Sequence, residues 1–315
     1  MYSRFLHTAA AGLLMLSAFA CGKQLPDGSA GAPISFRSGV ATKALLDTEG
    51  LKGETIVVND MHVSADWTTM QYMSNVPLEY KDAGWTTTPP YYWTKGGLHR
   101  FAAYIEDQQV SYRQGDEALV SGEITLSADN QPDLLYAFAV RDLDNSAEPH
   151  APVVLDFRHA LAAIRLTITN MKEDIGELKV SGYQMRNIVT GASFSVTAAD
   201  ADAVEYTMQR ASGGYIEDHV ETVPLNGSLT LYADTGGVGT DGSLLVWPQE
   251  VDGGSGPVTL VLTAGSGQIH IPLSTSSVSR WYAGRRYNYD INLSDDYIRV
   301  TATVQPWDIR DVIID

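Results

Sequence analysis

Apolar and polar residues alternate one by one in short runs that recur along the chain as far as its C-terminus. In the run from Ile298 to Val304, apolar residues at every second position are separated by Arg299, Thr301 and Thr303. Because successive side chains of a strand point to opposite faces, such a run predicts a strand with one buried face. Similar runs begin at Ile164, Leu229, Ile269 and Tyr287. No segment keeps a helical period over three turns, so the pattern predicts an all-β fold.

Turn-forming residues separate these runs, as at Asn226-Gly227, and many short strands between turns are typical of β-sandwiches. At 315 residues the chain exceeds the size at which one hydrophobic core usually keeps growing, which favours two domains. The stretch from Asp142 to Pro152 is polar and interrupted by proline, so we place the boundary there. We therefore expect two tandem β-sandwich domains, over residues 34–146 and 147–315.

The first twenty residues, 1–20, have the features of a secretory signal peptide. Arg4 precedes an uncharged apolar run from Ala9 to Ala20, which is too short to span a bilayer as a helix. Two interpretations share a cleavage point before Cys21: an ordinary A-x-A site, or a lipobox whose cysteine is acylated. Cys21 is the only cysteine of the chain, and an unpaired exported thiol needs a role, which favours lipidation. Residues 21–33 then form a flexible tether.

The charge balance argues against nucleic acid as a partner. The chain carries 21 basic and 38 acidic side chains, a formal net charge of −17. Such a surface repels phosphate backbones. With a single cysteine the chain can form no internal disulfide, so the hydrophobic core must hold the fold.

The sequence offers no constellation of residues for catalysis or for a metal. Its histidines are scattered without ligand spacing. Residues 237–242 match the G-x-G-x-x-G pattern, but a strand-like run ending at Pro248 follows where a phosphate-binding helix is required, so we predict a loop. His159 is predicted to be structural, with a buried imidazole bonded to a nearby backbone group. We therefore expect no enzyme activity, no cofactor and no metal site.

Aromatic residues gather at Trp85, Tyr91, Tyr92 and Trp93. Flat rings with polar edges can stack on sugars, so one interpretation is a glycan-binding patch. The other is a core cluster, since large aromatic side chains dominate the interiors of sandwiches. On a strand, Tyr91 and Trp93 share one face and Tyr92 takes the other. The second interpretation is favoured, and the first is kept as the alternative.

Several groups of residues, taken in their order and spacing, resemble a known family. They are Ile34-Ser35-Phe36 with Ala41-Thr42-Lys43-Ala44; Pro90-Tyr91-Tyr92-Trp93; Leu155-x-Phe157-x-His159-Ala160-Leu161; and Leu244 to Gln249, Trp281 to Tyr287 and Val304 to Trp307. With these groups the chain resembles the fimbrillin-like family of lipoproteins, which form or anchor type V pili in Gram-negative bacteria. The resemblance covers most of the chain after the signal peptide.

The resemblance implies two transthyretin-like β-sandwiches, export to the outer membrane as a lipoprotein, and assembly with other subunits into an adhesive pilus. In stalk subunits of the family, a protease removes the lipid, the tether and the first strand, and a strand of another subunit fills the vacated groove. Relatives are usually cut after Arg. Here Lys43 stands at the comparable place, and Arg37 lies within the expected first strand. An uncleaved anchor or accessory subunit therefore stays open beside a stalk subunit.

The C-terminal segment has features of a donor strand, because Trp307, Ile309 and Ile313 share one side after a break at Pro306. Asp311 interrupts that side, and the alternative is that the segment closes its own domain as an edge strand. The leading hypothesis is a structural pilus subunit. A surface lipoprotein that binds glycans comes second, and an enzyme comes last.

Overall fold

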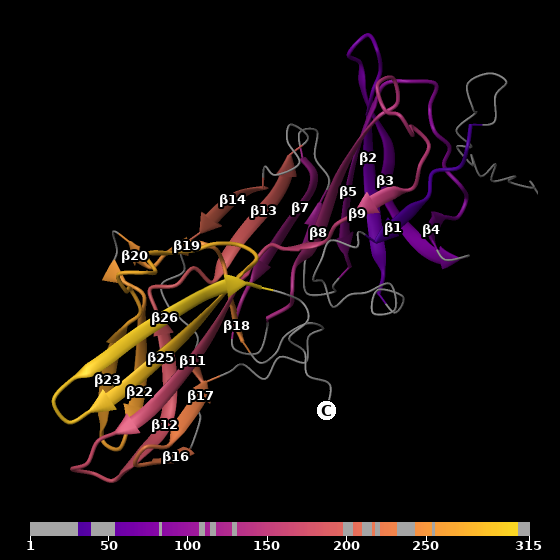
Figure 1. The fold of residues 1–315 in the computed structure, drawn as a ribbon. Coiled ribbons are helices and arrows are strands. Elements are labelled where there is room, and N and C mark those ends of the chain that lie inside the picture. Colours follow the sequence, from indigo (N-terminus) through magenta and orange to yellow (C-terminus); the bar gives the residue numbers. More distant parts are fainter. Residues whose placement is uncertain are drawn as a thin grey trace, which may run out of the picture.

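The computed structural model describes residues 31–38, 54–81, 84–106, 111–113, 118–127, 131–197, 204–209, 216–217, 221–231, 243–253 and 256–307. Within these ranges the chain forms strands β1 to β26 and no helix, which confirms the all-β prediction (Figure 1). It follows that none of the described segments is a helix suited to crossing a membrane. Several sequence predictions fall outside the description: the signal peptide, Cys21, Lys43, Ile309, Ile313 and residues 237–242.

The first half of the chain forms one eight-stranded sheet that folds over on itself. Strand β3 belongs to two layers, because residues 69–77 pair with β2 and residues 78–81 pair with β4. The rings of Phe36 on β1 and Phe101 on β5 meet at 5.5 Å, although three strands separate β1 from β5 in the sheet order. The layers therefore enclose a core between them. In sheet order the strands are β10 (Arg158–His159), β8 (Leu135–Asp142), β5 (Leu98–Ile105), β2 (Ile56–Val63), β3 (Thr69–Lys81), β4 (Gly84–Thr87), β1 (Phe36–Ser38) and β9 (Val153–Leu155).

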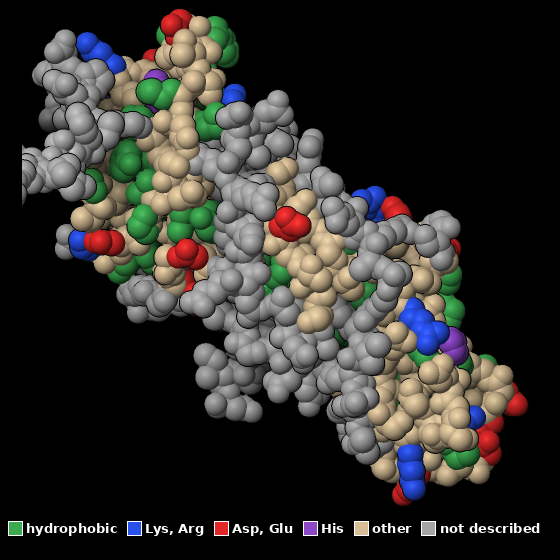
Figure 2. Space-filling model, turned by 180° about the vertical axis from the view of Figure 1, so that it is seen from behind, with side chains coloured by type: hydrophobic (Ala, Val, Ile, Leu, Met, Phe, Trp, Pro, Cys, Tyr) green, Lys and Arg blue, Asp and Glu red, His purple; other side chains and the backbone are tan. Residues whose placement is uncertain are grey.

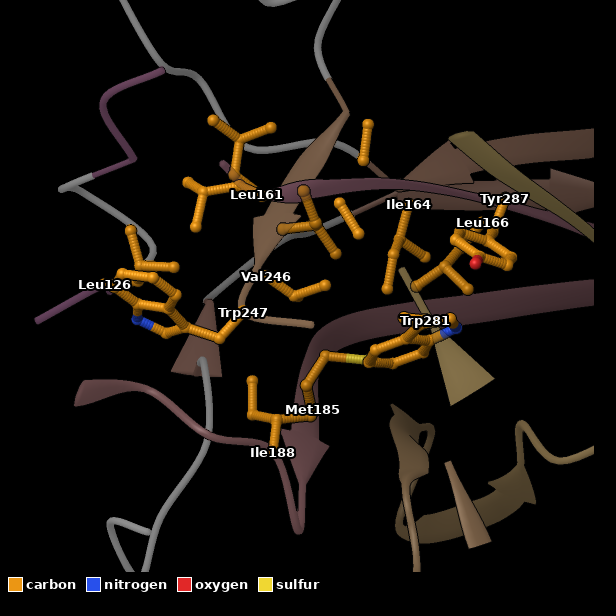
Figure 3. Packing of buried hydrophobic residues seen from close by; sticks show 14 of the residues in the cluster. Leu126, Leu161, Ile164, Leu166, Met185, Ile188, Val246, Trp247, Trp281 and Tyr287 are labelled. Atoms are coloured by element: carbon orange, nitrogen blue, oxygen red, sulfur yellow. The ribbon is translucent and has the colours of Figure 1, made fainter. Parts of the chain in front are cut away.

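The second half forms a sandwich of two five-stranded sheets. One has β17 (Ser228–Leu231), β11 (Ala162–Met171), β25 (Arg285–Ser294) and β26 (Ile298–Pro306) in order, with β18 (Leu244–Val246) also on β11. The other has β15 (Ile216–Glu217), β12 (Glu177–Arg186), β22 (Thr259–Ala264) and β23 (Gly267–Pro272), with β16 (Glu221–Pro224) also on β12. Figure 3 shows Trp247, Trp281 and Met185 directed into the core of this half. The Trp281 indole donates to the buried Tyr289 hydroxyl at 2.9 Å, which satisfies both polar groups.

Strand pairing crosses the expected boundary at residue 146. Strands β9 and β10 follow that position but belong to the first sheet. In the middle of the molecule, β7 (Ala118–Thr125) from the first half pairs with β13 (Gly191–Thr197) from the second, as Figure 1 shows. This sheet is completed by β6 (Ser111–Arg113) and β14 (Val204–Gln209). Two-stranded ribbons join β19 (Gln249–Glu250) to β24 (Arg280–Trp281) and β20 (Asp252–Gly253) to β21 (Gly256–Pro257). The halves are therefore linked by backbone hydrogen bonds as well as by chain continuity.

The alternating runs are strands, as predicted, and most bury the expected face. The odd-numbered apolar residues of β25, Tyr287, Tyr289, Ile291 and Leu293, are all buried. The Asn226-Gly227 turn is also present, with Asn226 at a φ of 63°. Strand β26 differs, because Ile298 and Val304 on its apolar face are 44% and 47% exposed. The physical reason is its place at the end of the sheet, where no further strand lies beside it in the part of the chain that the structure describes.

Candidate functional site: the first strand and its groove

The segment 32–38 is inserted between two parts of the first sheet. On one side Ile34 N–H donates to the Tyr91 carbonyl at 2.8 Å, and Trp93 N–H donates to the Ala32 carbonyl at 3.1 Å. On the other side Val153 N–H donates to the Ser35 carbonyl at 2.8 Å, and β1 runs parallel to β9. The segment is therefore a strand with partners on both edges, held as firmly by its neighbours as an interior strand is.

Two apolar side chains anchor this strand in the core. Ile34 and Phe36 are buried, and Phe36 packs edge-on against Phe101. Burial of an apolar side chain of this size stabilises the folded state by roughly 1.5–3 kcal/mol. If the strand left, Trp85, Trp93 and Leu155, which belong to the same cluster, would lose their cover. Without the strand, this part of the sheet is therefore an apolar groove with unpaired backbone groups on both walls.

Gly31 shows how closely the chain approaches the groove at its entrance. A Cβ atom at this position would lie 2.7 Å from the Trp93 carbonyl oxygen, a distance that no ordinary contact allows. Glycine therefore lets the backbone lie flat against residues 92–93, beside the Pro33–Tyr92 bridge. No pattern in the sequence predicts this role, because the close approach exists only once the strand is paired.

The aromatic cluster predicted from the sequence lines this groove, and the glycan interpretation needs correction. Trp85 and Trp93 are only 2% and 5% exposed, so neither indole presents a face to solvent. Trp93 packs edge-on against Phe101 and stacks on His150, while Tyr91 and Tyr92 are half-buried. Beside the rings, in their own layer, lies β1, which pairs with β4, and Phe101 of the facing layer packs against Trp93. Figure 2 shows other hydrophobic side chains grouped on the surface of this half of the molecule.

A buried polar network lies behind Trp93. His99 Nδ1 donates to Asp60 Oδ2 at 2.6 Å, and both side chains are fully buried. On the other side of the ring, Thr94 Oγ1 lies 2.9 Å from His99 Nε2, and His62 Nε2 donates to the Gly96 carbonyl at 2.8 Å. Burial raises the pKa of the Asp60 carboxyl, although the hydrogen bond and charge of His99 oppose that shift. The network fixes the rings against which Trp93 packs.

His159 is buried, as predicted, but its partner differs from the prediction. Its Nδ1 atom donates to Asp133 Oδ1 at 2.7 Å, so the acceptor is a carboxylate and not a backbone group. The imidazole stacks on Trp307, with ring centroids 3.7 Å apart. Trp307 is itself buried, and its backbone N–H donates to the Gly284 carbonyl at 3.0 Å. Of the three candidate donor residues, Trp307 thus contributes to the core of its own subunit.

Of the two candidate processing residues, the structure describes one. Arg37 lies within β1 with its side chain exposed and its backbone aligned with Val154 of β9. Lys43 lies outside the described residues. Wherever the structure describes the chain, His, Cys, Asp and Glu side chains form no group of three or more able to hold a metal ion.

The described residues form an all-β structure, and solved fimbrial and cell adhesion proteins share this class of fold. A fimbrial protein from Bacteroides vulgatus shares the fold, with a TM-score of 0.59, 14% sequence identity, and alignment over 87% of this chain and 98% of that one. Candidate cell adhesion proteins from Bacteroides uniformis and Bacteroides ovatus give TM-scores of 0.56 and 0.57 at 16% and 14% identity. Those alignments cover 88% and 91% of this chain and 98% and 100% of the other chains. At such low identities the likeness shows the fold alone.

The sequence model of a family described as Fimbrillin-like matches residues 42–307. The chain belongs to the fimbrillin-like family. Its role is therefore that of a subunit of cell-surface fimbriae, a structural and adhesive one. No curated protein sequence is significantly similar to the chain.

Proposed function

We propose that the chain is a pilus subunit that is exported as a lipoprotein through Cys21, is held at the outer membrane, and assembles by exchange of its first strand. One observation carries the proposal. The segment 32–38 is paired on both edges and buries Ile34 and Phe36, yet it stands at the N-terminal end of the described fold. A single cut after Arg37 or Lys43 separates all or most of it from the rest of the domain.

The physical chemistry of the groove supports exchange. Removing the strand leaves an apolar cleft and orphaned backbone groups, and each buried group without a partner costs about 1–3 kcal/mol. A strand from another subunit that restores the ladder and fills the Ile34 and Phe36 sites offsets that cost. An emptied groove must also be filled soon, since its unpaired edges and apolar floor make it prone to aggregation. Other pilus subunits, of the same or another kind, are the partners this groove suits, and no cofactor, metal, nucleic acid or catalytic step enters the proposal.

The test is the N-terminal residue of the protein recovered from the cell surface, together with electron microscopy of filaments. Cleavage after Arg37 or Lys43 gives Ser38 or Ala44 as the first residue. A double variant, Arg37→Gln with Lys43→Gln, should keep Cys21 with its acyl chains and form no filaments. The matched control is Arg165→Gln, which removes an exposed arginine from β11. Filaments built from subunits that still begin at Cys21 would overturn strand exchange. Wild-type protein that still begins at Cys21 and is absent from the filament shaft would instead leave an anchor role.

The donor is proposed to be the C-terminal segment that contains Ile309 and Ile313. Since Trp307 belongs to its own core, donation begins after it. Deletion of Val312 to Asp315 should abolish polymers and leave a folded monomer at the surface. If the truncated chain unfolds or is degraded, the segment closes its own domain and the donor must be sought elsewhere.

A further inference from the structure

Strand β26 forms a long, open edge on the second half of the molecule. It pairs with β25 on one side and, among the described strands, ends the sheet order on the other; Figure 1 shows it as the bright yellow arrow next to β25. Its apolar face carries Ile298, Val300, Ala302 and Val304, of which the first and last are among the most exposed large apolar side chains of the described residues. Arg299 is its only charged residue. Natural edge strands are usually protected by more charges or by bulges, so this edge is poorly defended against pairing.

The hydrogen bonds to β25 fix which backbone groups point to the open edge. Trp307 N–H donates to the Gly284 carbonyl, and Ser294 N–H donates to the Tyr297 carbonyl, each at 3.0 Å. In an antiparallel pair, residues whose backbone N–H and C=O groups point toward the neighbouring strand alternate with residues whose groups point away from it. In the observed register, the residues whose backbone groups point away from β25 are Ile298, Val300, Ala302, Val304 and Pro306. Among the described residues, the exposed apolar side chains and the ladder groups without a strand partner therefore belong to the same residues.

We infer that two copies of this chain pair through β26, antiparallel, to make one continuous sheet across a two-fold axis. In the proposed register the two-fold axis passes beside Thr301. Ile298 then lies opposite Val304 of the partner subunit, and Val300 lies opposite Ala302 of the partner subunit. Because all four residues direct their backbone groups outward, each of these pairs is a hydrogen-bonded pair. The half-exposed side chains of Ile298 and Val304 cover each other twice, once at each end of the strand.

Charge and backbone chemistry favour this occupant and this register. On the opposite face, Arg299 lies across from Thr303 of the partner subunit, so no like charges meet. Sliding the strands toward Pro306 brings in a residue without an N–H group and loses a ladder bond. One contact already reaches the edge, since Ser277 Oγ donates to the Ala302 carbonyl at 3.4 Å. A carbonyl oxygen accepts two hydrogen bonds, so this contact and the pairing are compatible. The inference does not depend on strand exchange at the first strand.

Disulfide trapping tests the register in the full chain, purified in detergent. In the proposed pairing Thr301 lies opposite Thr301 of the partner subunit as a non-hydrogen-bonded pair, about 4.5 Å apart between Cα atoms, which a disulfide can bridge. Thr301→Cys should therefore give a covalent dimer on treatment with diamide. The matched control is Thr303→Cys on the same face, since two copies of residue 303 lie roughly 14 Å apart in this register. Cys21 is present in both variants and in the parent chain, which sets the background.

Trapping of Thr301→Cys above that background, with Thr303→Cys at background, supports the pairing. No trapping at Thr301, or equal trapping at both positions, overturns it.

A second variant separates pairing from folding. Val300→Pro removes an N–H that points to the open edge and leaves the β25 ladder intact, so the monomer should stay folded and the molar mass by light scattering should halve. An unchanged molar mass in a folded Val300→Pro chain would equally contradict the inference.

Discussion

Asp60 and His99 lie 39 positions apart in the sequence and meet because β2 pairs with β5 in the first sheet. Their contact is fully buried, so removal of the carboxylate would leave the imidazole N–H as a buried donor without an acceptor. Around this pair, Trp93, Tyr72 and Phe101 all contact the His99 ring. A polar pair thus orients the aromatic side chains on which the first strand rests.

The pH dependence of stability at Asp60 follows from its raised pKa. In the folded chain this pKa lies above the ordinary value of 3.8, so between these values the folded state binds more protons than the unfolded state. The contribution to the free energy of unfolding is therefore fully present below pH 3.8 and is lost as pH rises through the folded-state pKa. Asp60→Asn cannot titrate. The stability of the wild-type chain relative to Asp60→Asn should fall as pH rises.

Urea unfolding of both chains from acid to neutral pH measures this difference. Asp290→Asn, at an exposed site on β25, is the control and should show no such trend. A relative stability of the wild-type chain that rises with pH would mean that the attraction of His99 outweighs desolvation. Nothing in the sequence predicts the pair, because register, and not spacing, brings the residues together. His159 was correctly predicted to be buried, but Asp133 could not be foreseen for the same reason.

At the scale of elements, β7 and β13 are held together by a tight contact between a glycine and an aromatic ring. A Cβ atom at Gly122 would overlap the Phe194 ring, which itself packs near Tyr136 of β8. The backbones face each other at this point, since Gly122 is the register partner of Phe194. Glycine is disfavoured in strands, so its presence here is explained by the space that the ring occupies.

Gly122→Val should destabilise the chain by about 1–3 kcal/mol, the usual cost of overpacking, although valine favours strands. Chemical denaturation measures the loss. Adding Phe194→Leu frees space, so the double variant should recover part of the stability, and the two effects should not add. If Gly122→Val unfolds like the wild-type chain, the ring moves aside freely and the contact does not hold the two strands.

The elements also show what sequence patterns can and cannot reveal. Alternation predicted β11 and β25 well, because long strands with one buried face repeat the pattern several times. Strands β9 and β10 are three and two residues long, too short for any period, and their partners lie far away in the chain. The same pattern predicted a buried face for β26, which the open edge leaves exposed. Periodicity records the two faces of a strand but not its neighbours.

At the scale of the whole molecule, one hydrophobic cluster extends across both halves. It includes Val57, Ala102 and Tyr136 from the first half together with Leu166 and Tyr289 from the second. The mixed pairing of β7 with β13 runs through the same region. Composition and length favoured two domains, but they say nothing about whether two cores touch. Shared burial is a property of the folded arrangement, and the sequence does not display it.

This shared core predicts a single cooperative unfolding transition. Far-ultraviolet circular dichroism and tryptophan fluorescence should give the same midpoint, since Trp85 and Trp93 report on one half and Trp247 and Trp281 on the other. Phe101→Ala, which opens a cavity in the first core, should lower that one midpoint without splitting the transition. Two separate peaks in calorimetry would show that the halves unfold independently.

The double-sided pairing of the first strand also has a mechanical consequence. If subunits join by the strand exchange proposed above, a filament under tension would pull each joint along the direction of the donated strand. The hydrogen bonds of β1 to β4 and of the segment to β9 lie on opposite edges and run across that direction. A strand seated in this position is therefore loaded in shear, so the bonds on both edges must rupture together instead of opening one after another. In the proposed exchange, a joint of this kind would resist the drag of flowing fluid better than its short length suggests.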